Sequence, residues 1–340
     1  MNKAGNNVGN HPSQCYGCSS CECICPKEAI SLAMDTQGFL YPQIDVSKCV
    51  NCGLCMHVCP IEKENSFKNI RADRCYAIKN SDSIRMTSSS GGVYTALTDQ
   101  VFKVGGVCIG SAYSENHRIV YTIAEDPEEG SEQRGSKYVQ SYMSPLLLNR
   151  VIEIIKAGRS ILISGTPCQI AGIKSFLNAK RIDSDKVLFL DIVCHGIPSP
   201  GVWSEYLSEI ENKYNSKIKR YSFRDKEKGW RGYHVRIELQ NGTILEGSNE
   251  ADSFINMFKE NLTLRDSCFG CPYATMERVG DITIGPSEHG ISYKRFWKTY
   301  EKMGFRGIKE RFAPGGRLYP IFYYRKAIRL RLKAIRKELM

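Results

Sequence analysis

Two cysteine-rich stretches near the start of the chain decide the fold of that part. Residues 15–26 read CYGCSSCECICP, and residues 49–60 read CVNCGLCMHVCP. Each stretch spaces four cysteines as C-x2-C-x2-C-x3-C and ends on a proline, and the second copy lies 34 residues after the first. This internal repeat predicts a small module built from two similar halves.

The spacing of both stretches is that of bacterial ferredoxins, whose cysteine thiolates hold 4Fe-4S clusters. Three closely spaced cysteines reach one cubane, whereas the fourth, turned away by the proline, reaches the other cluster. Zinc is the alternative, because CxxC pairs also occur in zinc ribbons, but two complete copies with Pro26 and Pro60 favour clusters. Cys23 interrupts the first stretch and is expected to be a bystander. The predicted ligand sets are Cys15, Cys18, Cys21 with Cys59, and Cys49, Cys52, Cys55 with Cys25.

The composition predicts a globular protein in a reducing compartment. Its 340 residues are 42% hydrophobic and 24% charged, a length that favours two domains with appendages. The 15 cysteines, without a signal-peptide pattern, indicate metal ligation or thiol chemistry rather than a disulfide scaffold. We find no run of eighteen apolar residues in the sequence. We therefore expect no membrane-spanning helix and a cytoplasmic protein.

The texture of the sequence divides the chain into three parts. Residues 1–68 form the predicted two-cluster ferredoxin module, with a polar linker over 62–74. Residues 75–290 alternate strand-like and helix-like segments, which indicates a mixed α/β domain. Residues 291–340 form a tail rich in Lys, Arg and aromatic residues. The predicted fold class is therefore α+β.

Apolar patterns in the second part predict individual elements. Strands are expected at 104–113, 117–124, 160–165 and 187–193, and helices at 145–157, 169–177 and 201–213. A hairpin is expected over 233–246, because Asn241-Gly242 supplies the positive φ angles of a type I′ turn.

The basic tail raises the question of a partner. The formal net charge is +11, and near the end Ile328, Leu332, Ile335 and Leu339 share one helical face while Arg and Lys fill the others. Such a helix either docks on its own protein by the apolar face or contacts an acidic partner or a membrane surface. No nucleic acid is expected as a partner. The positive net charge would also suit a zinc-stabilised nucleic-acid binder, whose binding would depend steeply on salt concentration.

Four further cysteines are candidates for a third 4Fe-4S cluster. Cys168 lies at a predicted strand-to-helix turn, where the helix dipole favours a thiolate, and Cys194 ends the next predicted strand. The ends of neighbouring strands can lie side by side, so Cys268 and Cys271 of a CxxC-Pro unit would complete four thiolates. The alternative is a separate metal, or none, at Cys268 and Cys271, with Cys168 a reactive thiol. His195 is a ligand, a proton donor or a hydrogen-bonding support.

Small residues before the apolar helix that begins near Val93 form a candidate phosphate site. Backbone N–H groups at a helix N-terminus favour phosphate, although Ser and Gly also cap ordinary helices. Ser136, Lys137 and Tyr138 would add a cation and an aromatic plane for a nucleotide or flavin ring, or else form a surface loop. The candidate phosphate turn consists of Ser88, Ser89, Ser90, Gly91 and Gly92.

Six motifs follow one another between residues 75 and 285. They are SSSGG at 88–92, GSKY at 135–138, GTPCQ at 165–169, DIVCHG at 191–196, SFRDK with GW at 222–230, and CFGC followed by GDITIG at 268–285. Together, and in this order, they resemble the coenzyme F420 hydrogenase/dehydrogenase beta-subunit family.

This resemblance implies a flavin-type domain that carries FAD, exchanges electrons with iron–sulfur clusters and transfers a hydride to or from an organic acceptor. Clusters move single electrons and a flavin collects two, so the combination converts one kind of electron transfer into the other. The fusion is similar to versions found beside bacterial surface-polysaccharide genes, which need not use the deazaflavin. One segment departs from the family: residues 286–290 read PSEHG where the family continues with an acidic residue, an aromatic residue, Trp and Gly.

The sequence therefore favours a cytoplasmic iron–sulfur oxidoreductase that uses FAD or another flavin, with a redox protein or a small organic acceptor as its partner. It identifies no catalytic residue. The alternative is a non-enzymatic electron-transfer or scaffold subunit that carries clusters and docks a partner through the basic tail. Flavin stoichiometry distinguishes these two functions.

Overall fold

The structure is a computed structural model that describes residues 8, 12–62, 67, 76, 78–227, 229, 234–248, 251–275 and 277–285. Most described residues belong to one compact unit, Met1–Phe258 with Thr263–Pro286. Most of the linker, Trp230, the PSEHG segment and the basic tail lie outside the described residues. Within the described ranges, no helix is long and apolar enough to cross a membrane.

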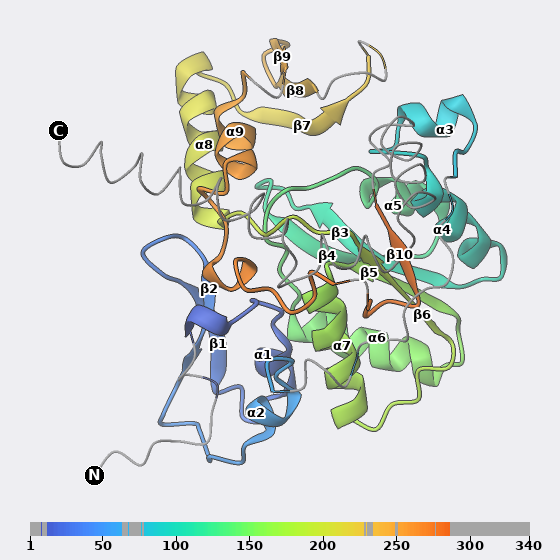
Figure 1. The fold of residues 1–340 in the computed structure, drawn as a ribbon, viewed down its shortest axis with the longest axis vertical. Helices are drawn as coiled ribbons and strands as arrows, with labels where there is room; N and C mark the ends of the chain where they lie inside the picture. Colours follow the sequence, from blue (N-terminus) through green and yellow to red (C-terminus); the bar gives the residue numbers. More distant parts are fainter. Residues whose placement is uncertain are drawn as a thin grey trace, which may run out of the picture. The chain divides into compact units, whose positions relative to one another are not determined.

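The cysteine-rich module contains two short helices and a two-stranded ribbon (Figure 1). The helices are α1 (Ser20–Ile24) and α2 (Leu54–Val58), and the antiparallel strands are β1 (Ile30–Met34) and β2 (Leu40–Ile44). Proline disfavours helical backbone at the residue before it. Cys25 and Cys59, each followed by proline, therefore adopt extended backbone at φ −70° and −67° and end the two helices. This directs the fourth cysteine of each stretch away from the other three.

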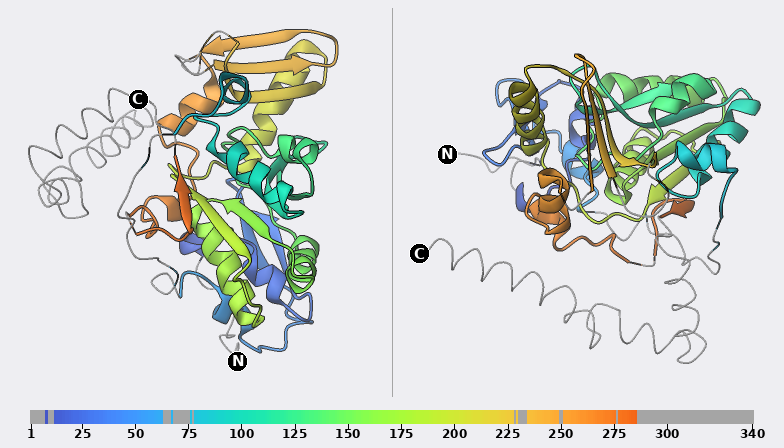
Figure 2. Two further views of the ribbon diagram at one scale, coloured as in Figure 1. Left: turned by 90° about the vertical axis from the view of Figure 1, so that its right-hand side faces the viewer. Right: turned by 90° about the horizontal axis from the view of Figure 1, so that it is seen from above.

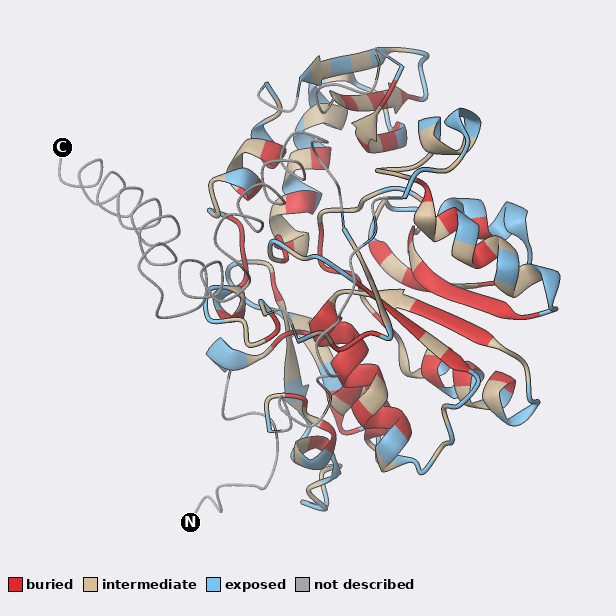
Figure 3. Cartoon of the chain, turned by 45° about the vertical axis from the view of Figure 1, so that its right-hand side comes forward, coloured by how far each residue is buried: buried red, intermediate tan, exposed pale blue. Residues whose placement is uncertain are grey.

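A five-stranded sheet forms the centre of the second part, in the order β10-β6-β5-β3-β4. Its strands are β3 (Val107–Tyr113), β4 (Ile119–Ala124), β5 (Ile161–Gly165), β6 (Val187–Ile192) and β10 (Ile282–Ile284). All neighbours pair in parallel except β3 and β4. The central strands are continuously apolar and buried, as expected of parallel strands covered on both faces (Figure 3).

Helices α3 (Asp82–Met86), α4 (Val93–Lys103), α5 (Pro127–Glu132), α6 (Pro145–Lys156) and α7 (Pro167–Ala179) accompany this sheet. Pro occupies the first turn of α5, α6 and α7, where its missing N–H costs nothing. Helix α7 contacts β5 and β6 on one side and α1 and α2 on the other. Ten of its thirteen residues are buried, and it joins the cysteine-rich module to the sheet in one core.

A three-stranded antiparallel sheet completes the described fold. It contains β7 (Ile218–Asp225), β8 (His234–Leu239) and β9 (Ile244–Ser248), and α8 (Pro200–Tyr214) and α9 (Ser253–Lys259) accompany it. The sheet lies at the top of Figure 1 and of the left panel of Figure 2, whereas α2 lies toward the bottom. Trp203, Tyr221, Phe223 and Phe254 pack between its strands and the two helices.

The α+β prediction is confirmed, and each strand and helix predicted between 104 and 213 is present within a few residues. The predicted type I′ turn is wrong. Gly242 has φ 87°, but Asn241 does not have a positive φ. Gly242 N donates to the Leu239 carbonyl at 3.1 Å, and Leu239 N donates to the Thr243 carbonyl at 2.9 Å. This is the pattern of a type I turn followed by a glycine bulge, which connects a hairpin equally well.

Candidate cofactor sites

The first predicted ligand set lines a single cavity in the cysteine-rich module. Cys15, Cys18, Cys21 and Cys59 face this cavity together with Leu32, Pro42 and Met56. Burial raises the pKa of the Cys21 thiol, and the neighbouring thiols of Cys18, Cys15 and Cys59 raise it further. Burial, with a smaller contribution from the neighbouring Cys18 thiol, also raises the pKa of the Cys59 thiol to about 12. These sulfurs therefore need a bound metal group to stay deprotonated.

The second predicted set lines another cavity. Cys25 comes from the first stretch, and Cys49, Cys52 and Cys55 come from the second. Cys23 lines neither cavity, and its sulfur donates to the Met143 carbonyl at 3.8 Å. Backbone N–H groups already point at two cluster-site sulfurs: Gly17 N at 3.4 Å from Cys15 Sγ, and Ala29 N at 3.3 Å from Cys25 Sγ. Such hydrogen bonds tune the reduction potential of a bound cluster.

The fourteen cysteines of the described ranges are all free thiols. No group of three or more His, Cys, Asp or Glu side chains in those ranges is close enough to hold a single metal ion. The two sets surround cavities instead, which is the arrangement that a cluster with its own iron and sulfide atoms requires.

The third predicted set also comes together. Cys168 lies in the first turn of α7, Cys194 lies two residues after the end of β6, and Cys268 ends a short 3-10 helix, Asp266–Cys268. Burial raises the pKa of the Cys168 thiol well above its usual range. The neighbouring thiols of Cys194, Cys271 and Cys268 raise it further. Burial also raises the pKa of Cys194 to about 12, with Cys268 as its strongest neighbour. The carboxyl ends of parallel strands β5 and β6 meet at one edge of the sheet and bring Cys168 and Cys194 together.

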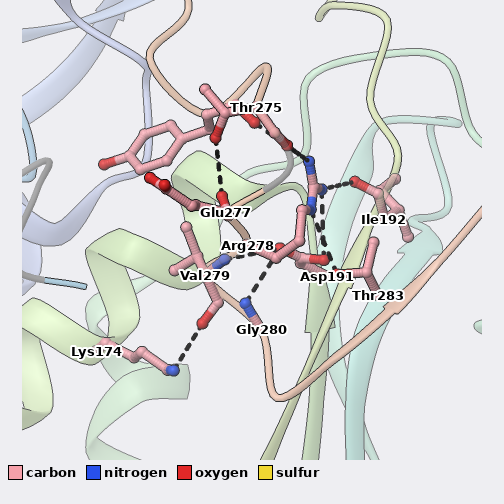
Figure 4. Close-up of polar contacts among 10 residues, drawn as sticks. Lys174, Asp191, Ile192, Thr275, Glu277, Arg278, Val279, Gly280 and Thr283 are labelled. Carbon is pink, nitrogen blue, oxygen red and sulfur yellow. Dashed lines mark hydrogen bonds and ion pairs between the residues drawn. The ribbon is translucent and has the colours of Figure 1, made fainter. Parts of the chain in front are cut away.

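A buried ionic contact holds the Cys271 segment against β6 (Figure 4). Asp191, fully buried near the end of β6, accepts hydrogen bonds from Val279 N at 3.2 Å and Gly280 N at 3.1 Å. Arg278 Nη2 lies 3.4 Å from Asp191 Oδ1 and donates to the Ile192 carbonyl at 2.9 Å. The loop after Cys271 is thereby fixed beside the strand that leads to Cys194.

Two tyrosines lie between the first and third cysteine sets. The rings of Tyr16 and Tyr273 are 5.6 Å apart in an edge-to-face arrangement. Tyr273 is buried, which raises the pKa of its hydroxyl, and Tyr16 and the thiols of Cys168 and Cys18 raise it further. The two sets of cysteines are therefore close neighbours.

The candidate phosphate turn lies between α3 and α4, and Gly92 caps α4 with φ 80°. The turn meets two cations of the SFRDK motif to which the sequence analysis gave no role: Arg224 in β7 and Lys226 directly after it. Lys226 Nζ donates to the carbonyls of Ser88 and of Arg85, the latter at 2.7 Å, and Arg224 Nη1 lies 3.5 Å from the Ser89 carbonyl. The sequence near residues 85–89 does not indicate these contacts, because the partners lie more than a hundred residues away. The SFRDK motif was the only pointer to them.

We call Arg224 and Lys226, together with the neighbouring Arg85, the cation cluster. Within residues 136–138, the contacts that the structure describes bring only Tyr138 to it. The Arg224 guanidinium lies 5.5 Å from the Tyr138 ring, and Tyr138 stacks on Phe258 at 5.0 Å. His195, next to Cys194, meets Phe258 edge-on at 5.1 Å. A row of aromatic side chains thus runs from the third cysteine set to the phosphate turn.

Ser136 is half-buried, and Lys137 turns toward its own loop. Lys137 Nζ donates to the Arg134 carbonyl at 2.8 Å and lies 5.5 Å from the Tyr113 ring centroid. Burial lowers its pKa to about 7. Lys137 is therefore a half-buried residue whose amine donates to its own loop.

Family models match most of the chain. The N-terminal part of the coenzyme F420 hydrogenase/dehydrogenase beta subunit matches residues 75–148, and its C-terminal part matches residues 158–300. The chain belongs to the coenzyme F420 hydrogenase/dehydrogenase beta-subunit family. A 4Fe-4S dicluster domain matches residues 14–63 of this family member, which supports iron–sulfur clusters in the module. The protein is an iron–sulfur subunit of oxidoreductase type.

Among solved structures, this family member is similar to a hydrogenase chain. That hydrogenase chain is part of the xenon-derivatised F420-reducing [NiFe] hydrogenase complex from Methanosarcina barkeri and is 15% identical, with a TM-score of 0.43. The match covers 69% of the present chain and 83% of the hydrogenase chain. No curated protein sequence matches.

Proposed function

We propose that the protein is an iron–sulfur flavoprotein oxidoreductase that passes electrons between its ferredoxin-type clusters and a flavin, and onward to an organic acceptor or a redox partner. The observation that carries this proposal is the convergence of Cys168, Cys194, Cys268 and Cys271 between the cysteine-rich module and the Tyr138 aromatic row. The four thiolates would hold the third 4Fe-4S cluster.

The third set lies within reach of the first because of a glycine. Gly172 follows Cys168 by four residues on α7, which is about 6 Å along the helix axis. A Cβ at Gly172 would lie 2.9 Å from Cys18 Sγ. Helix α7 therefore approaches the Cys15, Cys18, Cys21 and Cys59 site directly, one turn beyond Cys168. This closeness supports electron exchange between the two sites.

The cation cluster supports a phosphate-bearing flavin. Three cations, Arg85, Arg224 and Lys226, gather at the candidate phosphate turn. Burial lowers the pKa of Lys226 to about 8, and repulsion from Arg85 and Arg224 contributes to this shift. An anion relieves that repulsion, and the N-terminus of α4 favours it further. The residues that would hold the flavin are Ser88, Ser89, Ser90, Gly91 and Gly92 with Arg224 and Lys226 for phosphate, and Ser136 and Tyr138 for the ring. Lys137 would join them only by leaving the Arg134 carbonyl. Clusters exchange single electrons and a bound flavin exchanges pairs.

The proposal includes a cytoplasmic location, where cysteines stay reduced. It also includes three domains, at 1–68, 75–290 and 291–340. From the family resemblance we also propose a role in surface-polysaccharide biosynthesis. The basic tail would contact an acidic partner or a membrane surface.

The test is cofactor stoichiometry of protein reconstituted anaerobically with iron, sulfide and FAD. We expect about twelve irons and one flavin per chain. Cys268→Ser should lower this to about eight irons. The matched control is Cys108→Ser, because Cys108 is buried in β3 away from all three sets, and it should keep the full complement. Eight irons and no flavin in the unaltered protein would contradict the proposal and favour a non-enzymatic electron-transfer or scaffold subunit.

A further inference from the structure

Arg265 is a fully buried cation at the junction between the cysteine-rich module and the rest of the unit. Its Nε donates to the Cys15 carbonyl at 2.6 Å, and its Nη2 donates to the Leu40 carbonyl at 2.8 Å. Its Nη1 donates to Gln140 Oε1 at 3.0 Å. The guanidinium also lies 4.0 Å from the Tyr41 ring centroid. Two segments of the cysteine-rich module, at Cys15 and at Leu40, and one segment of the α/β part, at Gln140, therefore surround this charge.

No carboxylate of the described residues forms an ion pair with this guanidinium. Its three hydrogen-bond acceptors are neutral, and the adjacent Asp266 is exposed to solvent. Burying an unpaired charge is strongly unfavourable, so native proteins place a counter-charge near it. Among the described residues no side chain supplies the counter-charge of Arg265, which favours a bound anionic group in that role.

The first cysteine set lies on one side of Arg265. Gly17, between Cys15 and Cys18, has φ 66°, and a Cβ there would lie 3.0 Å from Arg265 Nη1 and 2.1 Å from Gln140 Nε2. The Gln140 Nε2 group donates to the Gly17 carbonyl at 3.2 Å. The cation and its amide partner therefore pack directly against the backbone of the ligand loop.

The third cysteine set lies on the other side. Cys268 N donates to the carbonyl of Arg265 at 2.9 Å. Arg265 directly precedes the 3-10 helix Asp266–Cys268, and Ser267 Oγ of that helix donates to the Cys15 carbonyl at 2.9 Å. The turn that carries Cys268 therefore packs against the first ligand loop, with Arg265 at its start.

We infer that Arg265 is the shared counter-ion of the cluster held by Cys15, Cys18, Cys21 and Cys59 and of the cluster at Cys168, Cys194, Cys268 and Cys271. Four thiolates give a 4Fe-4S cluster a net negative charge, which increases by one when the cluster accepts an electron. A fixed buried cation stabilises the reduced form more than the oxidised form, so Arg265 raises both reduction potentials. The second half of this inference rests on the third cluster proposed above, and the first half does not.

The experiment is an anaerobic redox titration of the reconstituted full chain, followed by electron paramagnetic resonance. Arg265→Gln removes the charge. Gln140→Glu keeps the arginine and places a carboxylate on its Nη1 without leaving a cavity, but it also exchanges the amide that donates to the Gly17 carbonyl for an acceptor. We expect each change to lower the reduction equilibrium constant of the first-set cluster at least tenfold, a shift of about 59 mV to lower potential for one electron.

Arg265→Lys retains the charge and should keep the potentials close to those of the unaltered protein. The matched control is Ser267→Ala, because Ser267 Oγ donates to the same Cys15 carbonyl at 2.9 Å without carrying a charge. It should leave the potentials unchanged. The cluster held by Cys25, Cys49, Cys52 and Cys55 serves as an internal reference and should shift least.

Unchanged potentials in cluster-loaded Gln140→Glu and Arg265→Gln would overturn the inference and leave Arg265 as a joint between segments. If Arg265→Gln fails to fold, unchanged potentials in Gln140→Glu overturn the inference by themselves. Iron content separates this outcome from failure of the proposed function: about eight irons in the unaltered protein would remove the third cluster, and the shift at the first-set cluster would still test Arg265.

Discussion

At the scale of single residues, Asp191 determines where the loop after Cys271 lies. Its carboxylate receives two backbone N–H groups and the Arg278 guanidinium, and it has no solvent exposure. Asp191→Asn removes the charge that balances Arg278 and sets an amide against the two donors. We expect a loss of about 3 kcal/mol in the free energy of unfolding, measured by anaerobic denaturant titration.

The same substitution should release the iron of the third site while the ferredoxin-type clusters stay bound. A matched control is Glu153→Gln, which removes an exposed ion pair with Arg150 at 2.7 Å and should change stability by no more than about 0.5 kcal/mol. If Asp191→Asn retains full iron and stability, the loop is held by other contacts and this account of Asp191 fails.

At the scale of elements, α7 determines how the module meets the sheet. The Gly172 surface admits the side chains of Ser20 and Cys18, and an added Cβ would lie 2.5 Å from Ser20 Oγ. Gly172→Ala must push α1 away from α7, which costs about 1–3 kcal/mol. The helix propensity of alanine offsets at most about 1 kcal/mol of that cost.

Iron analysis and spectroscopy should show the first-set cluster perturbed in Gly172→Ala and the second-set cluster intact. Gly247→Ala is the matched control, since it lies in β9 and the nearest atom to a Cβ there is Ala251 Cβ at an ordinary contact distance of 3.8 Å. Equal effects on both ferredoxin-type clusters would mean that the substitution disturbs the module as a whole, contrary to the local packing argument.

Helix α7 also marks how far the sequence could predict the structure. Its start was predictable, because a buried strand, Thr166 and Pro167 precede an apolar run. The surface that it offers to the module was not, because Gly172 gains its role only from the approach of Cys18. Likewise, cysteine spacing predicts a crossed ligand set, whereas nothing local to Arg265 indicates that its side chain meets Cys15, 250 residues away.

At the scale of the whole molecule, the described unit has two parts. One part, the cysteine-rich module with α7, surrounds the cysteine sets, and the other is the sheet β7-β8-β9 with α8 and α9. Tyr16, Gly172, Arg265 and Tyr273 lie at or between the first and third sets. The sheet β7-β8-β9 has its own core with α8 and α9, built around Trp203 and Phe223. Cluster binding therefore stabilises the first part directly, whereas the second part meets the module at the start of α8, where Gly201 N donates to the Gly38 carbonyl at 3.0 Å.

Removal of the clusters by an iron chelator under anaerobic conditions tests this division. We expect hydrogen exchange to accelerate at least tenfold in residues 15–60 and in α7, because buried thiols and the unpaired Arg265 charge then lack their compensating group. The amides of β7 and β8 should keep their protection, and they serve as the matched control within the same molecule. Uniform acceleration across both parts would mean that the whole unit unfolds as one and that the clusters support the three-stranded sheet as strongly as they support α7.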